Sequence, residues 1–287
     1  MNDYRDCDYF IDDLGDIHIV RGYLHPVNLV RTKLIYKKTS AGDRSRRNGD
    51  CYEKNQIDQI IYLPASRIKE YFRPLNNPIK TSLEGLWLDM YNELNNYVAA
   101  DDIGIFGSSL LDFPVTRDVD FIIYGLDNCR RIKSNIETIK MAMAVPGIST
   151  NHINYQSQKF SASHEPGNNT LAKTLANKWC TVQIAPGVSN TLMFGYKAEE
   201  IGDWLNADDR PGKDIVVEGE VLDDIRTNFS PRIFNVRDRR GIIFTVKTYY
   251  WAYHACVRIG DIVTIAGRLV DRNIILLNNF NHGIAIR

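Results

Sequence analysis

The sequence predicts an α/β (α+β) protein built from three parts, because the pattern of apolar residues changes twice along the chain. Residues 1–78 hold short strand-like runs separated by turn residues, whereas residues 79–210 alternate helix-like and strand-like segments. Residues 211–287 are short runs rich in β-branched residues and bounded by Gly, Asn or Asp. We therefore expect a small N-terminal α/β module (1–78), an α/β core (79–210) and a C-terminal β-barrel (211–287).

The N-terminal module is predicted from strand-like runs at 17–20, 29–36 and 60–63, with a polar connection at 39–49. Pro74 and Pro78 favour an extended linker at its end. The stretch from Arg31 to Lys54 has eight basic residues against three acidic ones, and Tyr36 and Tyr52 flank its centre. This stretch has two possible interpretations. It is either a surface that binds nucleic-acid phosphates and stacks its tyrosines on bases, or a solvated hairpin tip with half-buried tyrosines.

The core is predicted to begin with an amphipathic helix, because apolar residues recur every three or four positions from Leu83 to Val98. Strand-like runs follow at 103–106 and 119–124, and a second helix is expected from Leu126 to Ala144, before Pro146. A short helical run at 171–178 precedes a strand-like run at 181–184. This order of elements indicates an α/β layer.

The last part has strand-like runs at 215–221, 233–236, 242–248, 261–270 and 274–277, with glycines at the expected bends. Five short strands in so few residues favour an OB-like barrel, a fold that in many proteins binds single strands. The aromatic run 249–254, which includes His254, is either a base-stacking platform or barrel core and interface.

Composition restricts the functional class. Lys plus Arg and Asp plus Glu both number 35, so a nucleic-acid site would have to be a local patch. The N-terminus is acidic and no apolar run has the length of a membrane helix, so we expect a cytoplasmic protein with no membrane contact. The five cysteines are scattered without a CxxC pair, which predicts reduced thiols and no structural zinc.

The most informative stretch pairs a Gly-Ser turn with two carboxylates. Asp118 and Asp120 lie two apart on a predicted strand, so both side chains point to one face, where they can hold two divalent metal ions. Gly107 follows the preceding strand and lets the backbone approach a phosphate without a Cβ in the way. If a short helix begins at Ser108 or Ser109, free amides and a hydroxyl would face a triphosphate. The other predicted phosphate ligand is Arg117.

Phe106-Gly107-Ser108 followed by Asp118-Val119-Asp120-Phe121 resembles the motif of the DNA polymerase β-like nucleotidyltransferase superfamily. The likeness extends more loosely to uncharacterised archaeal and bacterial nucleotidyltransferase-domain proteins with a strand-rich C-terminal domain. It is carried by residues 22–26, by residues 63–69 and by the tail. The resemblance implies a polymerase-β-type core and Mg²⁺ (or Mn²⁺) on Asp118 and Asp120. It also implies transfer of a nucleoside monophosphate from an NTP to an acceptor hydroxyl, with release of pyrophosphate. The expected acceptors are an RNA or tRNA end, a protein side chain or a small molecule.

One position departs from the family pattern. A later strand of the family carries a third carboxylate, and the strand expected to match it, 181–184, has Gln183 instead. Glutamine cannot serve as a carboxylate base. Glu137 or Glu165 could complete the site, or two carboxylates suffice together with the triphosphate oxygens. The alternative function is a catalytically degenerate nucleotide- or RNA-binding protein, and a third is a structural adaptor.

Overall fold

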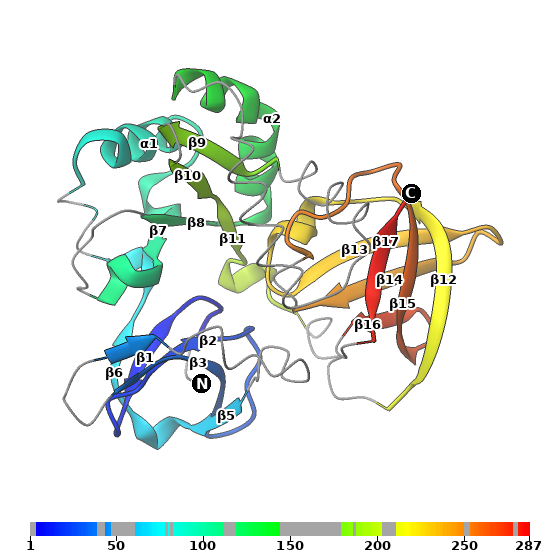
Figure 1. Cartoon of the computed structure of the whole chain (residues 1–287), viewed down its shortest axis with the longest axis horizontal. Helices are drawn as coiled ribbons and strands as arrows, with labels where there is room; N and C mark the ends of the chain where they lie inside the picture. Colours follow the sequence, from blue (N-terminus) through cyan, green and yellow to red (C-terminus); the bar gives the residue numbers. More distant parts are fainter. Residues whose placement is uncertain are drawn as a thin grey trace.

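The structure, a computed structural model, describes residues 4–38, 44–46, 61–77, 80, 83–111, 119–143, 179–185, 188–202, 211–249, 253–277 and 281–287. It is a mixed α+β protein in which strands predominate (Figure 1). None of the helices in these ranges has both the length and the apolar character needed to cross a membrane.

The N-terminal module is a six-stranded antiparallel sheet in the order β4-β3-β2-β1-β6, with β5 paired to β3. Its strands are β1 (Tyr9–Asp12), β2 (Ile17–Val20), β3 (Leu29–Lys38), β4 (Arg44–Arg46), β5 (Ile61–Pro64) and β6 (Ile68–Phe72). Two 3₁₀ turns, η2 (Ala65–Arg67) and η3 (Pro74–Asn76), complete it.

The expectation of an α/β module at 1–78 is corrected here, because its described residues form strands and 3₁₀ turns and no α-helix. The tight connection between β1 and β2 illustrates the reason: the Asp12 carboxylate accepts the amides of Leu14 and Asp16 at 3.0 and 2.9 Å. Antiparallel neighbours joined by such turns need no helical crossover.

The core contains a three-stranded sheet in the order β11-β8-β7. Strand β7 (Ile103–Phe106) runs antiparallel to β8 (Asp120–Tyr124), and β11 (Met193–Gly195) runs parallel to β8. The predicted helices are present as α1 (Gly85–Asn95) and α2 (Leu126–Ala142). A separate hairpin, β9 (Thr181–Ala185) and β10 (Val188–Thr191), lies beside them. The predicted helical run at 171–178 lies outside the described residues.

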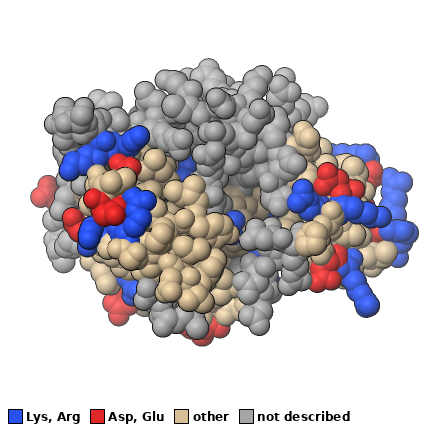
Figure 2. Space-filling view, turned by 90° about the horizontal axis from the view of Figure 1, so that it is seen from below, with Lys and Arg blue, Asp and Glu red and all other residues tan. Residues whose placement is uncertain are grey.

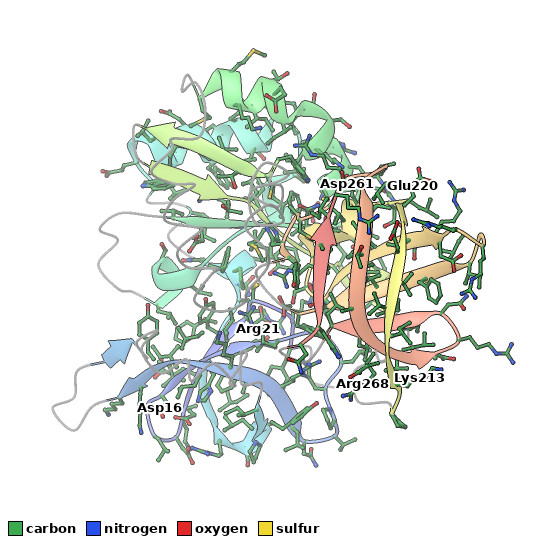
Figure 3. The ribbon with its side chains drawn as sticks, turned by 45° about the vertical axis from the view of Figure 1, so that its right-hand side comes forward. Asp16, Arg21, Lys213, Glu220, Asp261 and Arg268 are labelled. Atoms are coloured by element: carbon green, nitrogen blue, oxygen red, sulfur yellow. The ribbon has the colours of Figure 1, made fainter. Side chains whose placement is uncertain are left out.

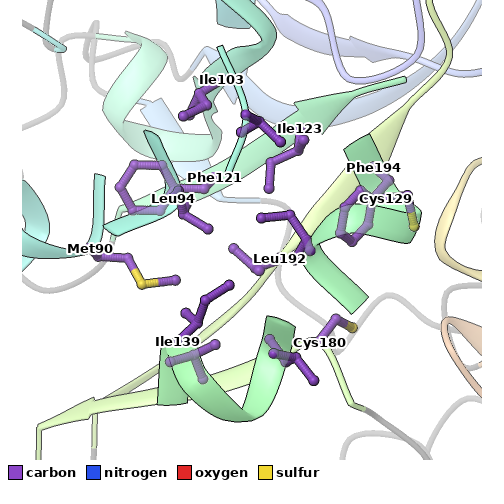
Figure 4. Packing of buried hydrophobic residues seen from close by; sticks show 14 of the residues in the cluster. Met90, Leu94, Ile103, Phe121, Ile123, Cys129, Ile139, Cys180, Leu192 and Phe194 are labelled. Atoms are coloured by element: carbon purple, nitrogen blue, oxygen red, sulfur yellow. The ribbon is translucent and has the colours of Figure 1, made fainter. Parts of the chain in front are cut away.

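Strand alternation gives β8 two different faces. Val119, Phe121 and Ile123 pack with residues of α1 and α2 in the largest hydrophobic cluster (Figure 4). Ile122 and Tyr124 pack instead against the N-terminal module. The core sheet therefore has helices on one face and the N-terminal sheet on the other, and Asp120 belongs to the second face.

The C-terminal part is a closed five-stranded barrel in the order β12-β13-β14-β16-β15, closed by pairing of β12 with β15. Its strands are β12 (Lys213–Val221), β13 (Arg232–Asp238), β14 (Ile243–Thr248), β15 (Ile262–Asp271) and β16 (Ile274–Leu277). Strand β14 pairs in parallel with β16, the other barrel pairs are antiparallel, and β17 (Gly283–Ile286) extends the sheet from β15. This arrangement fits the predicted OB-like barrel.

The three parts share one hydrophobic cluster. Phe229 and Ile233 of the barrel and Tyr23 of the N-terminal module are buried in the same cluster as the core residues. The Phe229 ring stacks on Tyr196 with centroids 4.5 Å apart. Tyr23 accepts a hydrogen bond from the Tyr196 amide at 2.9 Å. Because the three parts bury side chains in the same cluster, we expect the three parts to unfold together.

Candidate functional site

Asp120 is the first residue of β8 and lies opposite Phe106 of β7 in the antiparallel register. Its side chain is partly exposed, whereas every residue that follows it in the strand is buried. Because Phe106 ends β7, the chain turns at Gly107 directly beside the carboxylate. The pairing of two short strands thus brings the Gly-Ser turn and one of the two motif aspartates together.

Gly107 is held against the Asp120 carboxylate in a conformation that requires glycine. Its φ is +76°, and a Cβ added there would lie 2.4 Å from Asp120 Oδ2. A 3₁₀ turn, η6 (Gly107–Leu111), begins at this residue, before the possible helix start at Ser108 or Ser109 that the sequence left open. The sequence predicted that a phosphate would approach the Gly107 backbone closely, and in this structure the Asp120 carboxylate lies there.

Replacing Gly107 with alanine tests this contact. We expect Gly107→Ala to displace the Asp120 carboxylate and to lower any activity of the site by about 10-fold to 100-fold. Gly241→Ala is the matched control, because Gly241 has φ +83° and no atom within 4 Å of its would-be Cβ. Both variants carry the same backbone cost, roughly 1 kcal/mol, measured by denaturant unfolding. Equal activity in the two variants would contradict a functional contact at Gly107.

The other predicted site residues are described less fully. Ser109 is buried at 3% exposure, and its carbonyl oxygen accepts a hydrogen bond from Asn77 Nδ2 at 3.5 Å. The Ser108 backbone is part of η6. The Ser108 side chain, Arg117 and Asp118 lie outside the described residues, so their roles remain predictions.

The N-terminal module provides the surroundings of Asp120. Tyr9 of β1 is buried at 5% exposure, and burial, followed by nearby Cys7, raises the pKa of its hydroxyl far above the ordinary value. Arg21 acts to lower that pKa and the Asp120 carboxylate acts to raise it, so both charges lie near the hydroxyl. Tyr9 and Arg21 were not among the predicted site residues. They are about a hundred residues away in sequence, and no local motif marks them.

The strand expected to match the family's third-carboxylate strand is β9. In the described part of the chain β9 pairs with β10, whereas β11 pairs with β8. Strand β11 is formed by Met193, Phe194 and Gly195, none of which has a carboxylate. The Asn190 side chain of β10 donates a hydrogen bond to the Val119 carbonyl and holds the hairpin against the entry to β8. The Gln183 side chain lies outside the described residues.

Glu137, one of the two alternatives for a third carboxylate, does not complete the site. It lies on α2 with its side chain 77% exposed and forms an ion pair with Lys140 at 2.8 Å. Helix α2 covers the face of the sheet opposite to Asp120, so the two carboxylates are separated by the core. Glu165 lies outside the described residues.

The donor atoms available here fit a hard divalent cation in type. No group of three or more His, Cys, Asp or Glu side chains suited to a metal ion occurs in the described part of the chain. Within it, Asp120 supplies a partly exposed carboxylate. A bound Mg²⁺ would therefore take its remaining ligands from Asp118, from phosphate oxygens and from water.

Two weaker sequence signals can also be placed. His254 is fully buried, and its Nε2 lies 3.2 Å from the Asn228 carbonyl. Tyr253 belongs to the barrel core. For these two residues, the structure therefore favours a role in packing over the alternative of a base-stacking platform. Tyr36 packs against the cluster beneath β1 and β2, in agreement with the half-buried alternative. Tyr52 and residues 250–252 lie outside the described residues.

Comparisons of the chain with protein-family models, with curated proteins and with solved structures gave no match.

Proposed function

We propose that the protein is a magnesium-dependent nucleotidyltransferase that moves a nucleoside monophosphate from an NTP to an acceptor hydroxyl. The observation that carries this proposal is the contact of the Gly107 backbone with the Asp120 carboxylate on paired strands between two helices. The resemblance of the motif to the polymerase β-like superfamily supports it. The alternation of β8 supports it too, because it separates Asp120 from the apolar side chains at 119 and 121.

Each residue has a distinct role in this proposal. Asp118 and Asp120 would hold Mg²⁺ (or Mn²⁺), which neutralises charge on the phosphates when bound. Gly107 and Ser108, with Ser109 and Arg117, would bind the β- and γ-phosphates and orient the α-phosphate. The acceptor oxygen forms a bond to the α-phosphorus while its hydroxyl proton passes to solvent water. The bond from the α-phosphorus to the bridging oxygen breaks, and pyrophosphate leaves with that electron pair. Positioning and charge stabilisation would supply most of the rate enhancement.

The preferred acceptor is an RNA or tRNA end, followed by a protein side chain and a small molecule. The OB-like barrel is what favours a nucleic-acid strand, and this is an argument from fold analogy. The barrel contacts the core through Phe229 and Ile233, so a strand bound to it would be close to the core.

The test is a transfer assay with each α-labelled NTP, Mg²⁺ or Mn²⁺, and total RNA or protein extract as acceptor. Labelled product that disappears when EDTA removes the metal is the expected result. Its sensitivity to ribonuclease or protease then identifies the acceptor class. Absence of label with all four NTPs and both metals would overturn the proposal.

A degenerate nucleotide-binding protein is the second candidate, and the absence of a carboxylate on β11, the strand that pairs in parallel with β8, favours it. It predicts binding of NTP with Mg²⁺ and no transfer. Binding of labelled NTP with Mg²⁺, measured beside the transfer assay, separates the two candidates, because binding without any transfer supports the degenerate protein.

A further inference from the structure

Tyr9, on β1, faces the proposed site from the N-terminal sheet. Asp120 lies opposite Phe106 in the pairing of β7 with β8, and residues directly opposite one another point to the same face of a sheet. The N-terminal sheet covers that face, because Phe106 is buried in one cluster with Tyr9 and with Leu110, which belongs to η6. The Tyr9 side chain therefore lies in the layer that covers Asp120, beside the end of β7 and the turn that begins at Gly107.

The Tyr9 hydroxyl makes no hydrogen bond within the part of the chain that the structure describes, although the residue is only 5% exposed. The enclosed side-chain atoms without a hydrogen-bond partner include Asn190 Oδ1 and Ser230 Oγ but not this hydroxyl, so its oxygen keeps some access from outside. A mostly buried hydroxyl that makes no hydrogen bond is unfavourable. A ligand that accepts its proton would remove this cost.

Two opposite charges lie near this hydroxyl. Burial is the main cause that raises the pKa of Tyr9 far above the ordinary value of a tyrosine, while Arg21 acts to lower that pKa and Asp120 acts to raise it. The hydroxyl is therefore protonated at neutral pH and can donate a hydrogen bond. Figure 3 shows Arg21 at the side of the N-terminal sheet that faces the core. A hydroxyl donor and a guanidinium, near a carboxylate that would hold Mg²⁺, suit the oxygens of a phosphate.

The outer side of the N-terminal module has mixed charges. Seen from below, this lobe carries basic and acidic side chains beside one another around a broad uncharged area (Figure 2). Interspersed charges of both signs give little net attraction for a polyanion. A contribution of the module to phosphate binding would therefore come from its packed side, where Tyr9 lies.

We propose that the Tyr9 hydroxyl donates a hydrogen bond to a phosphate oxygen of the nucleotide bound at Asp120. This inference rests on the proposed function and adds the N-terminal module to its nucleotide site. The phosphates are the part of the nucleotide that Tyr9 would reach, because it shares a cluster with Leu110 of η6, the turn whose first residues would bind the β- and γ-phosphates. The hydroxyl would thus help to hold the triphosphate while the acceptor attacks the α-phosphorus.

The test is calorimetric titration of wild type and Tyr9→Phe with Mg²⁺–ATP and with Mg²⁺–tripolyphosphate. We expect the dissociation constant for both ligands to rise about 10-fold in Tyr9→Phe, because one hydrogen bond to a charged oxygen is lost. The midpoint of denaturant unfolding should not fall, since the hydroxyl has no partner to lose in the described part of the chain. Equal dissociation constants in wild type and variant would overturn the proposal. Weakening confined to ATP would place the hydroxyl on the nucleoside and overturn it too.

Tyr23→Phe is the matched control. Tyr23 belongs to the same module and is 8% exposed, but its hydroxyl accepts a hydrogen bond from the Tyr196 amide at 2.9 Å. We expect this variant to unfold at a lower denaturant concentration and to bind both ligands as wild type does. Equal weakening of binding in the two tyrosine variants would show a general effect on the module and would overturn the proposal.

A transfer assay on the same proteins separates this proposal from the proposed function. Where transfer occurs, KM for the NTP should rise about 10-fold in Tyr9→Phe with kcat nearly unchanged, because the contact is made both before and during the reaction. Weaker binding of both ligands by Tyr9→Phe, without transfer in wild type, supports the Tyr9 contact and overturns the proposed function alone. Transfer with an unchanged KM overturns the Tyr9 contact alone. Absence of ATP binding in wild type overturns both.

Discussion

Asp120→Asn should reduce nucleotidyl transfer by about 1,000-fold or more, roughly 4 kcal/mol of activation free energy, while leaving the fold intact. The amide keeps the size of the side chain and its place beside Gly107 but removes the charge that would hold a metal ion. Because the side chain is partly exposed at the start of β8, we expect the free energy of unfolding to change by less than about 1 kcal/mol. Steady-state transfer and denaturant unfolding measure the two effects separately.

Asp127→Asn is the control for that variant. Asp127 lies in the first turn of α2, its side chain is 85% exposed, and it pairs with Arg130 at 2.6 Å. The same chemical change should leave transfer unaffected there. Full transfer activity in Asp120→Asn would contradict the assignment of Asp120 as a metal ligand. Equal losses of transfer in both variants would show that any loss of negative charge lowers activity.

Phe229→Ala should have the largest effect on stability, a loss of about 3–5 kcal/mol. The ring is fully buried and lies between Tyr196 and Phe194, with centroids 4.5 and 5.9 Å away, so its removal opens a cavity between barrel and core. We expect thermal unfolding to change from one transition to two, because this contact couples the two parts.

Phe244→Ala is the matched change inside the barrel. Phe244 is 6% exposed and belongs to the barrel's own cluster, so its loss should destabilise the barrel without separating it from the core. A single transition in Phe229→Ala, with a loss below about 1 kcal/mol, would show that the shared cluster does not couple the parts.

What the sequence predicts well here is local. The helices at 85–95 and 126–142 and the strands of the barrel follow from the spacing of apolar residues, which depends on neighbours only a few positions away. The contact between Gly107 and Asp120 was also foreseeable, because two short strands close together in sequence pair most simply as antiparallel neighbours.

What the sequence did not reveal depends on long-range packing. The strand at 181–184 is apolar enough to lie beside β8, yet it pairs with β10, and β11 takes that position. Single-sequence patterns do not distinguish these pairings, because both runs are short and apolar. Tyr9 and Arg21 approach the site only because a separate sheet packs on the face of β8 that carries Ile122 and Tyr124.

The closure of the barrel by β16 affects the order in which the chain can fold during synthesis. Ile274–Leu277 pair with β14 on one side and with β15 on the other, and this strand joins the two. Until those residues leave the ribosome, β14 and β15 are made but each has an edge without its partner. Such edges readily pair with other chains. The emerging protein thus passes through an interval in which most of its barrel exists but cannot close, and chaperone binding would protect it then.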